Sequence, residues 1–346
     1  MARPPPAPVR SSRPVVRWLL ACVAMVSLMT LIGGITRLTG SGLSMVQWRP
    51  VSGALPPLCP DDWEALFAEY RGTPQFRLEN ARMTLGGFKR IFWWEYIHRL
   101  AGRVTGAVFF APLLILWRRG AISRALAPRL VLLGALGASQ GLMGWLMVKS
   151  GLVHDPRVSP LRLALHLGLA FALAGLLLRT ALALRDGFAR PAPPRPLARL
   201  ADALSAGVYL MALSGALVAG NHAGRAFNTW PLMMGRLVPA GLYAFDGVLT
   251  SSLHDVLTVQ FHHRVLALAL MVAVPAFCLR ARHLPHARRV SDLTLGLFAA
   301  QIALGISTLL LAVPTTLAVL HQANALALFL SLVATSHALQ RDRAMN

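Results

Sequence analysis

Eight apolar stretches of about 20 residues recur along this chain of 346 residues, and a helix of that length crosses a hydrocarbon core of about 30 Å. A segment that faces lipid must satisfy its own backbone hydrogen bonds, so such stretches fold as helices. The sequence therefore predicts an all-α integral membrane protein with eight transmembrane helices, at residues 16–36, 94–117, 129–149, 160–182, 201–220, 256–279, 293–313 and 316–339.

The composition agrees with a place in the bilayer. Hydrophobic residues make up 55% of the chain and charged residues 14%. The formal net charge of +21 would suggest a nucleic-acid partner in a soluble protein, but here the basic residues fall in short runs between apolar stretches. More than half of the 34 basic residues lie on the inner side if the N-terminus is cytoplasmic. The positive-inside rule therefore predicts cytoplasmic termini, lipid surroundings and no nucleic acid.

The segments outside the helices suggest how the chain is divided. The first apolar stretch runs into GGITRLTGSGLS without an A-x-A-like cleavage site, which favours a retained helix over a signal peptide. Residues 1–15 are rich in Pro and Arg and predict a disordered cytoplasmic tail. Residues 183–200 have a similar composition and predict a cytoplasmic linker, which separates an N-terminal half (16–182) from a C-terminal half (201–340).

The two predicted outer loops differ in length. Residues 37–93 contain DDWEALFAEYRG and MTLGGFKRIFWW, which we predict to form short interfacial helices, whereas residues 221–255 carry NHAGRAFNTWPLMMGRLVP. We expect both loops to cover the outer ends of the helices. Only Cys59 of the three cysteines lies in a loop, which excludes a disulfide within the loops and leaves open an intermolecular one.

The halves resemble each other in sequence. Three pairs of segments correspond: WEYIHRLAGRV (94–104) with VQFHHRVLALA (259–269), QGLMG (140–144) with QIALG (301–305), and LALHLGLA (163–170) with AVLHQANA (318–325). An even number of spans separates the members of each pair, so both halves have the same orientation. This indicates a parallel repeat, with two four-helix bundles side by side.

Four histidines, His98, His166, His263 and His321, stand at corresponding places of the repeat, each near the outer start of a predicted helix. An imidazole in a membrane segment costs free energy unless it is bonded, so we interpret the four as functional. Two imidazoles from facing helices suit the axial positions of a heme iron, whereas zinc usually gathers three or four protein ligands. The spacing therefore predicts two heme sites, His98 with His166 and His263 with His321.

Residues next to these histidines indicate which histidine is the ligand and which side chains could bind heme propionates. The repeat aligns Arg264 with Arg99 and thereby favours His263 over its neighbour His262 as a ligand. The two arginines are candidate partners for heme propionates, although interfacial snorkelling explains them equally well.

Glu95 precedes His98 by three residues and so shares its helical face, whereas the corresponding residue in the second half is Gln260. This difference predicts a reactive first half with a proton-transfer group and a second half that carries electrons or is structural. The alternative is that Glu95 only pairs with Arg99 or Lys89.

Six segments together resemble the heme A synthase family, in a form close to that of alphaproteobacteria and mitochondria. They are GGITRLTGSGLSMVQWRPVSGALPP, FKRIFWWEYIHRLAGR, VSPLRLALHLGLA, NTWPLM, FHHR and LHQANA. They occur in order along residues 15–338. Some bacterial members of the family carry two cysteines in the first outer loop, whereas this loop has only Cys59, so a mechanism that needs that disulfide does not carry over.

The resemblance implies an iron-dependent oxidoreductase of heme A biosynthesis, which serves cytochrome c oxidase biogenesis in the bacterial inner membrane. A methyl group of heme O would be oxidised through a hydroxymethyl stage to the formyl group of heme A. The family's catalytic glutamate maps to Glu95, its substrate-heme ligands to His98 and His166, and its heme b ligands to His263 and His321. Heme O synthase, oxidase assembly factors and a second copy of the chain are the candidate protein partners.

Two other functions remain open at this point. A diheme b-type cytochrome that only carries electrons explains the four histidines but not the difference between Glu95 and Gln260. A transporter built from parallel repeats explains the architecture alone.

Overall fold

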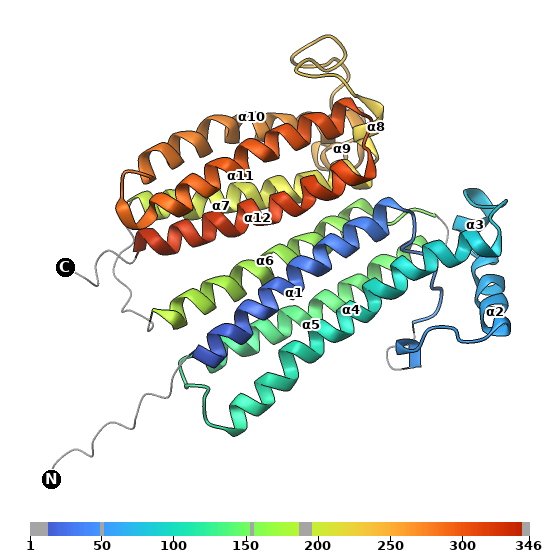
Figure 1. Ribbon diagram of the computed structural model, residues 1–346. Helices are drawn as coiled ribbons and strands as arrows, with labels where there is room; N and C mark the ends of the chain where they lie inside the picture. The colour runs from blue at the N-terminus through green and yellow to red at the C-terminus, as the bar shows by residue number, and fades with distance from the viewer. Residues whose placement is uncertain (1–12, 49–51, 153–155, 187–195, 341–346) are drawn as a thin grey trace.

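The computed structural model describes residues 13–48, 52–152, 156–186 and 196–340. Within these ranges the chain is helical without strands, and eight helices are long and apolar enough to cross a membrane (Figure 1). The predicted all-α membrane fold with eight spans is therefore confirmed. The eight are α1 (Arg13–Leu38), α4 (Leu85–Arg118), α5 (Ala127–Gly151), α6 (Pro160–Arg185), α7 (Pro196–Gly220), α10 (Val256–Ala281), α11 (Pro285–Leu310) and α12 (Thr315–Gln340).

Capping side chains fix the outer ends of two equivalent helices, α4 and α10. The hydroxyl of Thr84 accepts a hydrogen bond from the amide of Gly87 at the start of α4. The carboxylate of Asp255 accepts from the amides of Leu257 and Thr258 at the start of α10. Such caps satisfy amide groups that the first helical turn leaves free, so the helices that carry His98 and His263 have chemically defined starts.

The helix that carries His98 is longer than the sequence predicted. α4 begins at Leu85, so MTLGGFKRIFWW is not a separate interfacial helix and that prediction is wrong. The Thr84 cap starts the helix early, and the charged and aromatic residues that lowered the apolar signal continue it without a break. The other predicted short helix, DDWEALFAEYRG, is confirmed as α2 (Pro60–Arg71).

Helix also occupies the ends of the predicted tail and linker. α1 begins at Arg13, within the predicted tail, and residues 1–12 lie outside the described residues. α6 ends at Arg185 and α7 begins at Pro196, so both ends of the predicted 183–200 linker are helical. Residues 187–195, in the middle of the linker, lie outside the described residues.

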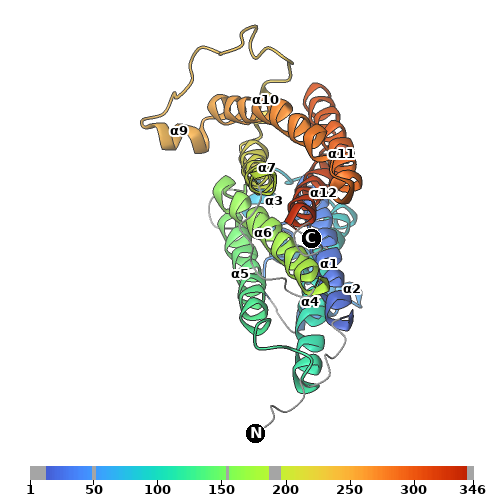
Figure 2. The same ribbon diagram turned by 90° about the vertical axis from the view of Figure 1, so that its left-hand side faces the viewer.

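The eight long helices lie in two groups of four, seen in Figures 1 and 2. α1, α4, α5 and α6 form one group, and α7, α10, α11 and α12 form the other. The groups meet where α1 and α6 contact α7 and α12, while α4, α5, α10 and α11 lie on the outside. α1 begins and α12 ends at the same end of the molecule, as an even number of spans requires.

Apolar and polar contacts join the two groups. The rings of Phe171 and Phe329 have centroids 5.6 Å apart, and one hydrophobic core takes residues from both groups. Gln322 donates a hydrogen bond from Nε2 to the carbonyl of Thr30 at 2.7 Å, and the guanidinium of Arg37 donates to the carbonyl of Ala219. The groups therefore form one packed unit.

An aromatic cap covers the outer end of the first group. It consists of α2, the short helix α3 (Pro74–Leu78) and the outer turns of α4, with a 3-10 turn at Ser52–Ala54. Its rings pack against one another in edge-on, tilted and stacked pairs, the stacked ones being Tyr70 with Phe88 and Phe92 with Tyr96. They belong to Trp63, Phe67, Tyr70, Phe88, Phe92 and Tyr96.

The second outer loop is more open. It contains the short helices α8 (Ala223–Ala226) and α9 (Val248–His254), and the chain between them stands away from the long helices in Figures 1 and 2. Leu237 and Leu249 are exposed there. The outer ends of the two groups are therefore covered unequally.

We expect Phe88→Ala to loosen the aromatic cap, because the Phe88 side chain is fully buried between α2 and α4. Removing a buried phenyl ring costs about 3–5 kcal/mol. In detergent, limited proteolysis should cleave residues 60–78 faster in this variant, whereas Leu78→Ala, at an exposed position, should leave the rate unchanged. Equal rates for Phe88→Ala and the unchanged chain would show that α2 is held by other contacts.

Candidate functional site

The four histidines of the repeat lie on four different helices. His98 is on α4, His166 on α6, His263 on α10 and His321 on α12, each partly buried and in the half of its helix nearest the outer loops. Because α4 starts early, His98 lies further from the start of its helix than the other three.

The histidines form two pairs. His98 and His166 lie close enough for a charge on one to act on the other, and the same holds for His263 and His321. The Nδ1 atoms of His98 and His166 are buried and have no hydrogen-bond partner within the described ranges. A buried polar atom without a partner costs about 1–3 kcal/mol. Paired imidazoles on separate helices are a donor set that fits the two axial positions of a heme iron.

A glutamine contacts the ring of the second histidine in each pair. Gln140 Nε2 lies 3.4 Å from His166 Nε2 and donates to the carbonyl of His166 at 3.0 Å. Gln301 Nε2 lies 3.2 and 3.3 Å from the two ring nitrogens of His321. In the sequence these glutamines indicated only that QGLMG and QIALG correspond, and the structure shows them beside the candidate ligands.

Glu95 is buried, and its carboxylate is fully engaged. Oε2 accepts hydrogen bonds from the hydroxyl of Ser44 and the amide of Met45, both at 2.7 Å. Oε1 accepts two bonds from Arg99, at 2.6 and 3.1 Å. The pairing with Arg99 considered in the sequence is therefore present. Lys89 does not take part, since its Nζ lies over the ring of Trp63 at 5.0 Å.

Arg99 also holds the first outer loop to α4. Its Nη2 donates to the carbonyl of Met45 at 2.7 Å, and its Nη1 donates to the carbonyl of Gln47 at 3.1 Å. Together with Glu95, Arg99 clamps residues 44–47 against the helix turn next to His98. Sequence reasoning missed these loop residues, because contacts of an irregular loop leave no periodic signal.

The second half repeats this clamp with a neutral side chain. Gln260 Nε2 and Arg264 Nη2 both donate to the carbonyl of Phe227, at 3.0 and 3.1 Å, and Arg264 Nη1 donates to the carbonyl of Leu232 at 3.3 Å. Arg264 is only 7% exposed, which differs from a snorkelling side chain. Its Nε is buried without a partner among the described residues.

The neighbours His262 and His263 have different surroundings. The Nε2 of His262 lies 2.9 Å from the hydroxyl of Tyr243 in the second outer loop. The Nδ1 of His263 lies 3.3 Å from the hydroxyl of Ser214 on α7. His263 therefore faces into the helix group and His262 faces the loop.

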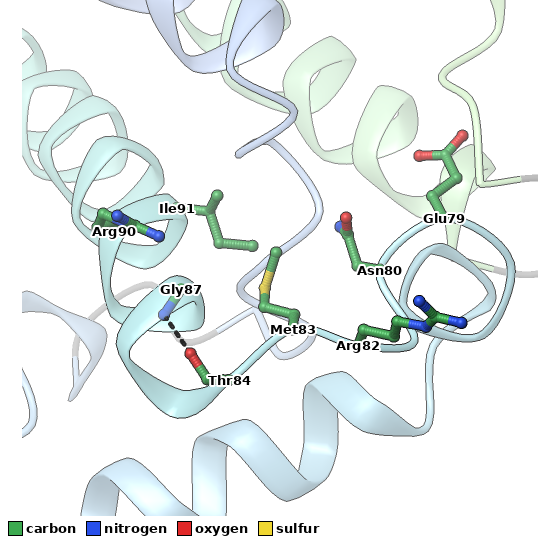
Figure 3. Close-up of a pocket in the computed structure, with 8 residues that line it drawn as sticks. All are labelled: Glu79, Asn80, Arg82, Met83, Thr84, Gly87, Arg90 and Ile91. Atoms are coloured by element: carbon green, nitrogen blue, oxygen red, sulfur yellow. Dashed lines mark hydrogen bonds between the residues drawn. The ribbon is translucent and has the colours of Figure 1, made fainter.

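The hollow in Figure 3 is separate from the histidines. It has a volume of about 450 Å³ and lies at the outer edge of the aromatic cap, lined by Glu79, Asn80, Arg82, Met83, Thr84, Gly87, Arg90 and Ile91. Over the described ranges, no three His, Cys, Asp or Glu side chains come together to hold a metal ion. The three cysteines are free, with Cys59 exposed.

Comparison with known proteins gives consistent matches along the chain. The family model described as "COX15-CtaA: Cytochrome oxidase assembly protein" matches residues 16–333. A protein of Nitrosospira multiformis named heme A synthase is 47% identical over 336 residues, which cover 95% of this chain and 94% of that protein. A protein of the same name from Rhodospirillum centenum is 46% identical over 348 residues, which cover 97% of this chain and 92% of that protein. Another from Caulobacter vibrioides is 45% identical over 318 residues, which cover 91% of this chain and 92% of that protein.

The residues matched by the family model span both halves of the chain and the positions of all four histidines, and the matches agree with the resemblance found in the sequence motifs. The chain belongs to the COX15-CtaA family of cytochrome oxidase assembly proteins.

Proposed function

We propose that this chain is a heme A synthase, an oxidoreductase that converts a methyl group of heme O through a hydroxymethyl stage into the formyl group of heme A. The observation that carries the proposal is the unequal pair of histidine sites, one beside a buried carboxylate and the other beside an amide. The name shared by the relatives supports the same activity.

In this proposal the substrate heme O binds in the first group, with His98 and His166 as its axial ligands. Two observations support this role: their Nδ1 atoms have no hydrogen-bond partner in the described part of the chain, and they lie on separate helices. The apolar tail of heme O would lie between helices or in lipid, where burial of hydrocarbon is favourable.

The second group would hold a resident heme b, with His263 and His321 as axial ligands. A heme in this position supplies one-electron transfer. The hydroxyl of Ser214 can accept a hydrogen bond from His263 Nδ1, which leaves Nε2 as the nitrogen for iron. His262 is directed to Tyr243 instead, which supports the choice of His263.

Glu95 is the proposed catalytic residue. Gln260 anchors the equivalent loop of the second half with an amide, so loop anchoring alone does not require the charge of Glu95. The carboxylate would hold or accept a proton near the reacting methyl group, or stabilise positive charge that develops on the oxidised carbon.

The two arginines are unequal candidates for heme propionates. Arg99 already donates to Glu95 and to two loop carbonyls, whereas Arg264 has a buried Nε without a partner in the described part of the chain. We therefore favour Arg264 as a propionate partner and Arg99 as a residue that positions Glu95.

The chain would act in the biogenesis of cytochrome c oxidase in a bacterial inner membrane, with both termini in the cytoplasm. The arginine-rich inner segments and the common end of α1 and α12 support this orientation. Heme O synthase, oxidase assembly factors and a second copy of the chain remain the proposed protein partners.

The activity can be tested by extracting heme from the purified protein and resolving heme B, heme O, heme A and the hydroxymethyl intermediate by chromatography with mass detection. Glu95→Gln should keep its hemes, because an amide oxygen can still accept from Ser44 and Met45. Heme A should fall by roughly 10²-fold or more if the carboxylate acts in proton transfer. Glu79→Gln, at the exposed hollow, is the matched control and should keep normal heme A.

The same extraction separates the two functions suggested by the sequence. Heme B with heme O, heme A or the intermediate supports the synthase. Heme B alone at two per chain, unchanged by Glu95→Gln, would indicate a diheme electron carrier. Normal heme A in Glu95→Gln would remove Glu95 from the reaction.

The ligand choice in the second group is tested by His263→Ala and His262→Ala. We expect His263→Ala to lose heme B while heme O remains bound in the first group, and His262→Ala to retain both. Reduced absorption spectra and pyridine hemochrome assays measure each heme. Loss of heme B in His262→Ala alone would reverse the assignment.

A further inference from the structure

Each histidine of the first pair has a glycine of a neighbouring helix in contact with its imidazole ring. An ideal Cβ added to Gly33 on α1 would lie 3.0 Å from Cε1 of His98, and one added to Gly144 on α5 would lie 3.1 Å from Cε1 of His166. At both glycines the three nearest atoms all belong to the imidazole. Even a methyl group in place of either glycine hydrogen would press on the ring.

The second pair has the same arrangement. An ideal Cβ at Gly215 on α7 would lie 3.2 Å from Cε1 of His263, and one at Gly305 on α11 would lie 2.9 Å from Cε1 of His321. Gly144 and Gly305 end the corresponding segments QGLMG and QIALG. The glycine contact therefore occurs at all four histidines, from matching helices of the two groups.

Other glycines of the long helices show that this contact is specific. Gly141 on α5 and Gly296 on α11 have open space where a Cβ would lie. Gly175 and Gly220 serve helix packing, since a Cβ there would meet the ring of Phe329 and the backbone of Pro160. Small residues commonly let membrane helices approach. Among the glycines in the described ranges, only the four opposite the histidines have an imidazole as their nearest neighbour.

We propose that Gly33, Gly144, Gly215 and Gly305 are positioning residues, the histidine seats, which fix the plane of each axial imidazole. This inference rests on the proposed heme ligation. Glycine is a poorer helix former than alanine, and at these four positions its use has a local reason. The reason is room: the flat ring lies directly against the backbone of the neighbouring helix, which blocks rotation of the ring toward that side.

The two groups hold their first histidine differently. Ser214, next to Gly215, places its hydroxyl 3.3 Å from His263 Nδ1, so that ring has both a seat and a polar partner. The residue before Gly33 is Ile32, and His98 Nδ1 has no partner within the described residues. The seat is thus the main restraint on the ring of the substrate-side ligand, whereas a resident heme would have a doubly fixed ligand.

The test uses the purified, heme-loaded protein and measures the ligand field rather than turnover. In a ferric heme with two histidine ligands, the largest g value in electron paramagnetic resonance depends on the angle between the imidazole planes. Gly215→Ala and Gly305→Ala should shift the g value of heme B or lower its content at least twofold. Gly33→Ala and Gly144→Ala should do the same for the heme of the first group.

Three control variants separate the seat from general effects of alanine. Gly141→Ala and Gly296→Ala add a methyl group in open space, and Gly175→Ala crowds Phe329 at 2.8 Å without contacting a histidine. All three should keep the g values and heme content of the unchanged protein. An equal spectral change in Gly175→Ala would show that helix crowding is responsible and would overturn the inference.

A double substitution keeps the inference testable if a seat variant folds poorly. Gly305→Ala should lower the thermal unfolding temperature of the otherwise unchanged apoprotein, but should leave it unchanged or raise it when combined with His321→Ala, because the crowded ring is then gone. The same loss in both backgrounds would overturn the inference. If the unchanged protein binds no heme, the proposed function fails. If it binds heme normally and all four seat variants match it, only the seats fail.

Discussion

The hydrocarbon core decides which parts of this chain can carry function. Because lipid offers no hydrogen bonds, the backbone N–H and C=O groups bond to one another within eight helices. Every buried polar side chain therefore needs a partner from a neighbouring helix or loop. Most have one: Gln322 bonds to Thr30, and Glu95 bonds to Ser44, Met45 and Arg99. Several buried polar atoms of the described residues have none, and they include Nδ1 of both His98 and His166 and Nε of Arg264, the neighbour of His263. That makes the pairs, rather than the hollow at the surface, the place where a ligand is needed.

The two clamps show how duplicated halves can differ in chemistry while sharing a structural task. In the second half, Gln260 and Arg264 hold the loop carbonyls of Phe227 and Leu232 without any acidic partner. In the first half a buried carboxylate is added beside the arginine, at a desolvation cost that a neutral amide would avoid. The surroundings of the two sites consequently differ by one negative charge. A site that must release protons from its substrate gains from such a charge, and a site that only exchanges electrons does not need it.

The sequence was informative wherever one residue type repeats along a helix. Apolar length predicted all eight spans. The duplicated histidines indicated which helices carry the candidate site, and that assignment stays a prediction. The start of α4 was misplaced, because Lys89, Arg90 and the tryptophans lower the apolar signal although Thr84 caps the helix earlier. The clamps could not be predicted, since the paths of residues 44–47 and 227–232 depend on tertiary contacts. Glycines such as Gly33 resemble ordinary packing residues until the opposite helix is placed.

One helix, α1, contacts the ligand-bearing helices of both groups, α4 of the first and α12 of the second. Gly33 and Gly34 are adjacent on α1. Gly33 lies against the ring of His98, and an ideal Cβ added to Gly34 would lie 3.0 Å from Nε2 of Gln322, the neighbour of His321 on α12. Gln322 is fixed in turn by its bond to the carbonyl of Thr30 on α1. A shift of α1 against α12 would therefore disturb the ligand helices of both groups. Specific hydrogen bonds as well as apolar packing close this interface, so α1 links the positions of the two histidine pairs.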